Sequence, residues 1–217
     1  IDVRWVFKWK WDSETRAAES STSGTSTSRR IIRARLCLRG FKDVQARDIA
    51  SYAGTSQRYS QRIVCSEAVV RKWPIATTDI SKAFLQGVTY KELAETTGEP
   101  LREVNFTLPA YCIPYLRKCK GFETFDPKLE VLHCDKPGTG CNDAPRCFSM
   151  KLSKITRDIC GMQASTVDPE LCFLHQDAGN GKKQLVAIMA KHVDDLKLAG
   201  SKDCIVWILQ QIEKAFG

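Results

Sequence analysis

The clearest pattern of apolar and polar positions lies near the end of the chain. An apolar run at 185–190 leads into two adjacent acids, Asp194 and Asp195, and a second, mostly apolar segment follows at 196–200. This order predicts a β-hairpin with an acidic tip, and an acidic turn without function is the simpler interpretation of such a pair taken alone. Two carboxylates held side by side repel each other, however, and a divalent cation shared with a third acid would relieve that repulsion.

A second hairpin is predicted near the start of the chain. Aromatic residues occupy every second position from Trp5 to Trp11, with lysines among the residues between them. A second alternation at 31–40 has apolar residues on one side and arginines on the other. We expect two paired strands that present lysine and arginine together. The Ser/Thr/Gly-rich residues 19–28 predict a mobile loop.

The other periodic segments predict alternating helices and strands. Asp79 ends a short β-branched run, where a capping role is the simplest interpretation. Gly138 and Gly140 permit close backbone approach, and Asp143 is a good N-cap for the next helix. The expected helices lie at 60–72, 91–97 and 145–160 and after Ser201. The expected strands lie at 75–80, 104–108, 130–134 and 185–193, and 166–174 is expected to be a turn that leads into a strand. This order predicts an α+β fold with two helices on one face of a small antiparallel sheet and acids on two central strands.

The composition of the chain indicates which class of partner the protein binds and in which compartment it is found. Residues 1–72 contain 15 Lys and Arg against 7 Asp and Glu, whereas the remainder contains 18 of each, so the whole excess of +8 lies in the first third. Charge placed in this way is typical of a protein that binds a polyanion. None of the ten cysteines forms a C-x-x-C pair, which favours a reduced, intracellular protein. No apolar run approaches the roughly 20 residues of a membrane helix. Since the chain begins at Ile1, we expect it to be a piece of a longer protein.

Six motifs in family order resemble the reverse transcriptase of copia-type LTR retrotransposons, the RNA-dependent DNA polymerase domain of a Pol polyprotein. They are Trp-Val-Phe-Lys at 5–8 with Lys10, Arg-Ala-Arg-Leu at 33–36 through Arg-Gly-Phe at 39–41, Asp-Ile-Ser-Lys-Ala-Phe-Leu-Gln-Gly at 79–87, Gly140 through Ala-Pro-Arg at 144–146, Asp-Pro-Glu-Leu at 168–171, and His-Val-Asp-Asp-Leu at 192–196.

The resemblance implies a particular architecture. The fold would be a right-hand polymerase palm, built on a ferredoxin-like split βαβ antiparallel sheet with helices on one face, together with a fingers subdomain and a truncated thumb. The fingers would comprise about 1–72 and 88–144, the palm about 73–87 and 145–200, and the start of the thumb-side helix 201–217.

The resemblance also implies a reaction, the RNA- or DNA-templated transfer of a nucleotide from a dNTP to a primer 3′-OH. Two Mg²⁺ ions, with Mn²⁺ as a possible substitute, would stabilise the attacking and leaving oxygens. The catalytic residues would be Asp79, Asp194 and Asp195, and the metal-binding residues these three together with Ile80. The expected nucleotide-binding residues are Arg33, Arg35, Phe84 and Gly140, and the template- or primer-contacting residues Ala144, Pro145, His192 and Val193.

Some of these assignments stay open at the level of sequence. Either Arg33 or Arg35 could clamp the triphosphate. Phe84 matches the aromatic residue that excludes a 2′-hydroxyl, but a core position explains it about as well. His192 stands where the family usually has tyrosine and, unlike tyrosine, histidine titrates near neutral pH. Residues 138–141 replace the common Leu-Tyr-Gly-Leu.

The expected partners are an RNA or DNA template with its primer, dNTPs, and the integrase and RNase H portions of the parent polyprotein, with no membrane partner. The expected location is a cytoplasmic virus-like particle or the nucleus. One alternative is an inactive retroelement remnant that at most binds nucleic acid. A more distant alternative is a metal-dependent phosphohydrolase or nuclease, which the scattered positions of the three histidines disfavour.

Overall fold

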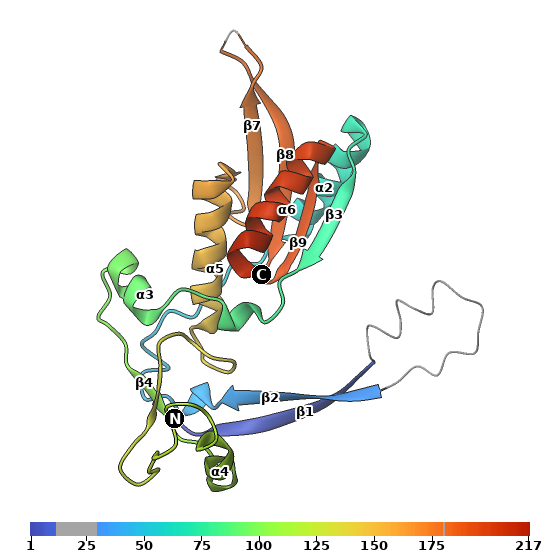
Figure 1. Ribbon diagram of the computed structural model, residues 1–217. Coiled ribbons are helices and arrows are strands. Elements are labelled where there is room, and N and C mark those ends of the chain that lie inside the picture. Colours follow the sequence, from blue (N-terminus) through green and yellow to red (C-terminus); the bar gives the residue numbers. More distant parts are fainter. Residues whose placement is uncertain (12–29, 180) are drawn as a thin grey trace, which may run out of the picture. The chain divides into compact units, whose positions relative to one another are not determined.

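A computed structural model describes residues 1–11, 30–179 and 181–217 (Figure 1). The chain forms two compact units. The first, here the hairpin unit, comprises Ile1–Ala46, Glu103–Cys134 and Gly138–Cys141. The second, here the sheet unit, comprises Arg47–Arg102, Asp135–Pro137 and Asn142–Gly217.

The hairpin unit is built around two long paired strands. Strand β1 (Val3–Trp11) pairs antiparallel with β2 (Arg30–Leu38), as the alternating sequence predicts. The predicted loop at 19–28 lies outside the described residues. Two further strands pair within this unit and are shorter than predicted. The smaller elements are β4 (Val104–Phe106), β5 (Leu132–Cys134), the 3-10 turns η1 (Gly40–Lys42) and η3 (Ala110–Cys112), and α4 (Ile113–Leu116).

The sheet unit contains a five-stranded antiparallel sheet in the order β3-β9-β8-β7-β6. Its strands are β3 (Ile75–Asp79), β6 (Gln163–Ala164), β7 (Leu171–Asp177), β8 (Lys183–His192) and β9 (Asp195–Gly200). Its helices are α2 (Arg58–Arg71), the 3-10 turn η2 (Ala83–Leu85), α3 (Tyr90–Thr97), α5 (Ala144–Lys154) with a π-helical continuation (Ile155–Ile159), and α6 (Lys202–Phe216). In the described part of the chain, no helix combines the length and apolar character needed to cross a membrane.

The expected pair of helices on one face of this sheet is present, but a further helix, α2, covers the other face, which was not expected. Helices α5 and α6 pack on one face, where Phe148 and Ile208 join Met189 in one buried cluster. Helix α2 packs on the other, where Val64 and Ile188 belong to a second cluster. The physical reason is that β8 is apolar on both sides over 187–190, and each side must be covered.

Two helices of the sheet unit, α5 and α6, begin differently. The Ser201 side chain accepts a hydrogen bond from the backbone N–H of Cys204, which confirms the predicted cap of α6. Asp143 precedes α5 but makes no side-chain cap, so that prediction was wrong. Its carboxylate instead forms a buried ion pair with Arg102, because a buried guanidinium needs a charged partner more than the helix end needs a cap. Helices α2 and α3 both belong to the sheet unit, whereas the resemblance assigned their residues to the fingers.

Candidate active site at the ends of strands β3 and β8

The structure brings Asp79 to the acidic hairpin tip. Asp79 is the last residue of β3 and lies directly opposite Asp195, the first residue of β9. The backbone N–H of Ile80 donates to the carbonyl oxygen of Asp194 at 3.1 Å and extends this pairing into the turn. Because directly opposed residues of an antiparallel pair project to the same face, the side chains of Asp79 and Asp195 share one side of the sheet.

The turn that carries the acids has an unusual backbone. The pair His192–Asp195 closes the β8–β9 hairpin, which leaves Val193 and Asp194 as a two-residue loop. Val193 has φ of 59°, in the left-handed region where a β-branched side chain is strained. Such a conformation costs on the order of 1–2 kcal/mol and persists only where the surroundings enforce it. The tip is therefore held in place by its neighbours rather than by its own preference.

A pocket of about 480 Å³ lies beside these acids. Asp79, Asp195 and His192 line it together with two basic residues, Arg58 from the start of α2 and Lys197 from β9. Among the described residues, no ion pair joins either basic side chain to either carboxylate. The pocket thus presents carboxylates, which attract a cation, and basic groups, which attract a phosphate, without one neutralising the other.

Sequence reasoning did not select the two basic residues of this pocket. Lys197 could have been found from strand periodicity, because it lies two residues after Asp195 and therefore on the same face. Arg58 carries no comparable signal. Its place in the pocket depends on the packing of α2 against the sheet, which the sequence did not reveal.

The donor chemistry of the tip fits a hard divalent cation. Carboxylate oxygens are the ligands that Mg²⁺ prefers, and Asp79 and Asp195 supply two on adjacent strands, with Asp194 next along the chain. Across residues 1–11, 30–179 and 181–217, no three His, Cys, Asp or Glu side chains gather into a group that could hold a metal ion. Ile80, the other predicted ligand, is 5% exposed. A metal held by these four residues stays a prediction.

The remaining predicted residues divide between the two units. In the sheet unit, Phe84 is half-buried against the larger hydrophobic cluster, Ala144 is buried, and Pro145 is half-buried in the first turn of α5. The hairpin unit contains the other three, which are Arg33 opposite Lys8, Arg35 opposite Val6, and Gly140. Their roles toward nucleotide and template stay predictions.

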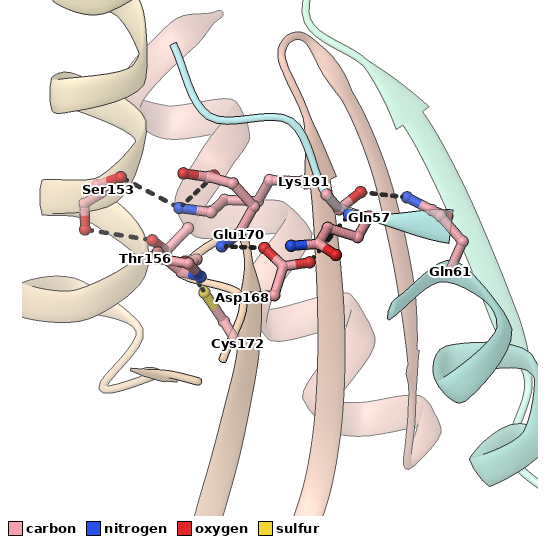
Figure 2. Close-up of polar contacts among 10 residues, drawn as sticks. Gln57, Gln61, Ser153, Thr156, Asp168, Glu170, Cys172 and Lys191 are labelled. Carbon is pink, nitrogen blue, oxygen red and sulfur yellow. Dashed lines mark hydrogen bonds and ion pairs between the residues drawn. The ribbon is translucent and has the colours of Figure 1, made fainter. Parts of the chain in front are cut away.

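A buried polar network supports the strand that leads into the turn (Figure 2). Lys191 is 3% exposed, and its Nζ lies 3.1 Å from Glu170 Oε2 and 3.1 Å from Ser153 Oγ on α5. Its backbone N–H donates to the Glu170 carbonyl at 2.9 Å. Its own carbonyl accepts from the backbone N–H of Ser56 at 2.8 Å. Sequence reasoning missed Lys191, although a lysine at the end of an apolar strand is a signal that a partner is needed.

Asp168 anchors the neighbouring part of this network. Its carboxylate accepts hydrogen bonds from the backbone N–H of Gln57 at 2.9 Å, from the backbone N–H of Glu170 at 3.0 Å and from the hydroxyl of Ser60. Burial raises the pKa of Asp168, but these hydrogen bonds and the charge of Lys191 outweigh burial and leave the pKa below its ordinary value. The Asp-Pro-Glu-Leu motif at 168–171 therefore joins the start of α2 to the strand that leads into the turn.

Comparison with known proteins gives two related sequences. The retrovirus-related Pol polyprotein from transposon RE1 of Arabidopsis thaliana is 26% identical over 202 residues, and that from transposon RE2 of the same plant is 25% identical. Each match covers 93% of this chain but only 11% of the relative's length. No protein-family model matches the chain. The similarity to two transposon Pol polyproteins over nearly the whole chain confirms the resemblance in its motifs and supports a retroelement origin.

Proposed function

We propose that this chain is the polymerase core of a retrotransposon reverse transcriptase, which transfers a nucleotide from a dNTP to a primer 3′-OH on an RNA or DNA template. One observation carries the proposal. The β3–β9 register sets Asp79 opposite Asp195, beside Asp194, on a pocket that also contains unneutralised basic side chains. The similarity to Pol polyproteins supports it.

Each residue of the tip has a role in this proposal. Asp79, Asp194 and Asp195 would hold the divalent cations, which when bound supply charge neutralisation at the reacting phosphate. Arg58 and Lys197 would contact phosphate oxygens of the primer or nucleotide from the walls of the same pocket. Because phosphoryl transfer requires little covalent chemistry from the protein itself, the main requirement is that the strand ends hold these carboxylates and basic side chains rigidly.

The hairpin unit would bind the polyanionic substrates and act as fingers to the sheet unit's palm. Its two long strands contain six basic residues and no acidic residue, namely Arg4, Lys8, Lys10, Arg30, Arg33 and Arg35. The opposite face of β1 is aromatic, and Phe7 and Trp9 are 66% and 63% exposed. Exposed aromatic rings suit a strand of nucleic acid, because bases can stack on them, and the basic side chains of the other face can bind phosphates. Arg33 and Arg35 would contact the triphosphate.

The chain spans 11% of the length of its curated relatives, so the other partners are further proposals. The integrase and RNase H portions of a parent polyprotein would act with it, in a cytoplasmic virus-like particle or in the nucleus. A second candidate function is nucleic-acid binding without polymerisation, which the basic strands of the hairpin unit would support by themselves.

Primer extension tests the proposal. The 217-residue chain should extend a primer on poly-rA with Mg²⁺ and dNTPs. Asp194→Asn should reduce the rate at least about 100-fold, as expected when a group that stabilises developing charge is removed. The matched control is Asp203→Asn, an exposed carboxylate at the start of α6. Equal rates for the wild type and Asp194→Asn would refute the assignment. Salt-dependent binding of primer–template without any extension would favour the second candidate.

A further inference from the structure

The burial of the ion pair between Lys191 and Glu170 is not explained by stability alone. Their side chains are only 4% and 13% exposed. Removing two charges from water costs several kcal/mol, and replacing such a pair with apolar side chains of similar volume is often neutral or stabilising. Strand β8 is otherwise apolar over 187–190, so a methionine at position 191 would fit the same surroundings. The pair is therefore better explained by the segments of the chain that it holds in position.

Lys191 is fixed from three directions. Its side chain reaches Glu170, which precedes β7, and Ser153 on α5 (Figure 2). Its backbone N–H donates to the Glu170 carbonyl, and its carbonyl accepts from the N–H of Ser56, just before α2. The carboxylate of Glu170 is itself enclosed, because a Cβ added at Gly54 would lie 1.9 Å from Glu170 Oε1. Neither partner of the pair can shift without moving a neighbouring segment.

This anchor lies immediately before the acidic turn. His192 forms an isolated bridge with Thr55, so the segment before α2 is paired with two successive residues of β8. Val193 follows in its strained left-handed conformation, and Asp194 and Asp195 come next. A strained turn relaxes when its ends are free to move, and here one end is held by the Lys191 contacts.

We propose that Lys191 and Glu170 are positioning residues, whose ion pair holds the 192–195 turn so that Asp194 and Asp195 face Asp79 in the arrangement that binds a divalent cation. The inference rests on the proposed function for its consequence in catalysis, but its direct readout is metal affinity. Groups that orient metal ligands without touching the metal typically change metal affinity by about 10–100-fold. Loss of this pair should have an effect of that size.

The test compares four forms of the chain by Mn²⁺ titration, followed by electron paramagnetic resonance. They are the wild type, Lys191→Met, the double variant Lys191→Met with Glu170→Met, and the control Arg102→Met. The control breaks another buried ion pair of the sheet unit, between Arg102 and Asp143, whose side chains are 7% and 2% exposed and whose residues lie after α3 and before α5 in the chain. All titrations are made below the melting temperature of the least stable variant, so that loss of folding does not enter the comparison.

Lys191→Met should raise the dissociation constant for Mn²⁺ at least about tenfold. The double variant should recover much of the thermal stability, because no unpaired charge remains buried, but it should not recover Mn²⁺ affinity. Arg102→Met should lose stability and keep wild-type affinity. In primer extension, Lys191→Met should raise the Mg²⁺ concentration for half-maximal rate by a similar factor, with the KM for primer–template within about twofold.

Wild-type Mn²⁺ affinity in Lys191→Met or in the double variant would overturn the inference. An equal loss of affinity in Arg102→Met would also overturn it, because general destabilisation would then be the cause. A wild-type chain that binds Mn²⁺ but extends no primer would refute the proposed polymerase while the affinities still decide the role of Lys191. A wild-type chain that binds no Mn²⁺ would refute both.

Discussion

Replacing Gly140 with alanine tests why a glycine occupies this position of the hairpin unit. Gly140 has φ of 96°, in the left-handed region, and a Cβ added there would lie 2.1 Å from the carbonyl oxygen of Leu38. Two hydrogen bonds join the same segments. The backbone N–H of Leu38 donates to Thr139 O at 2.8 Å, and that of Gly40 donates to Gly140 O at 3.1 Å. The loop thus lies directly against the end of β2.

The magnitude of the effect follows from these contacts. A left-handed alanine costs about 1–2 kcal/mol, of which about 0.4–1 kcal/mol is recovered because alanine restricts the unfolded chain. Relief of the clash requires the loop to move away from β2, which would break the two hydrogen bonds at about 1 kcal/mol each. We therefore expect Gly140→Ala to lower the free energy of unfolding of the hairpin unit by about 3 kcal/mol.

Gly121→Ala is the matched control for this variant. Gly121 lies in the same unit with φ of 89°, but an added Cβ would have nothing within 4 Å. It should lose about 1 kcal/mol or less, from the backbone conformation alone. Urea unfolding followed by tryptophan fluorescence measures both variants. If Gly140→Ala and Gly121→Ala were equally destabilised, the close approach to Leu38 would not constrain this loop.

Three further predictions concern buried charge, pH and salt. Arg102→Met should lower the free energy of unfolding in urea by about 3–5 kcal/mol, because it leaves a buried carboxylate unpaired. Arg146→Met, which breaks a more exposed pair, should lower it by less than about 1 kcal/mol. Similar losses in the two variants would contradict the burial argument. The pKa of Asp168 is lowered in the folded chain, so its carboxylate contributes stability above its ordinary pKa of 3.8, and this stability is lost as the pH falls through the lowered pKa. Asp168→Asn should therefore make the free energy of unfolding depend less steeply on pH on the acid side. An unchanged slope would contradict this. The double variant Arg33→Gln with Arg35→Gln should bind single-stranded RNA more weakly. The slope of the logarithm of its binding constant against the logarithm of the salt concentration should fall by about 0.7 for each phosphate that is no longer neutralised. A slope equal to that of the wild type would show that neither arginine binds a phosphate.

The elements that could be predicted are those whose pattern is local. Strands β8 and β9 follow from the apolar segments on either side of the acidic pair, helix α6 has a clear periodicity, and the Ser201 cap is read directly from one residue type. The side on which α2 packs was not predicted, because it depends on tertiary contacts. The run from Ala187 to Ala190, apolar on both faces of the strand, was nevertheless a usable signal that both faces would be covered.

The site shows the same division between local and distant information. The acidic turn follows from local sequence, and the family resemblance grouped Asp79 with it, but the register that sets Asp79 opposite Asp195 was not predicted. A register slip of one residue would turn the Asp79 side chain to the other face of the sheet, and composition cannot exclude such a slip. Asp143 was assigned to a helix cap from its local position. Its actual partner, Arg102, lies 41 residues away in the chain, so no local pattern indicated the ion pair. The Lys191 network joins segments that are distant in the chain, so a lysine at the end of an apolar strand signals that a partner is needed but not which residues supply it.

Diffraction from crystals grown with Mn²⁺, primer–template and an incoming nucleotide would show directly whether the acidic turn and Asp79 hold a divalent cation. We expect an anomalous manganese peak at the ends of β3 and β8, with oxygens from Asp79 and from Asp194 or Asp195 within about 2.0–2.6 Å of the metal. Absence of a peak there, at a Mn²⁺ concentration that saturates the chain in solution, or an ordered manganese held only by other residues, would contradict it.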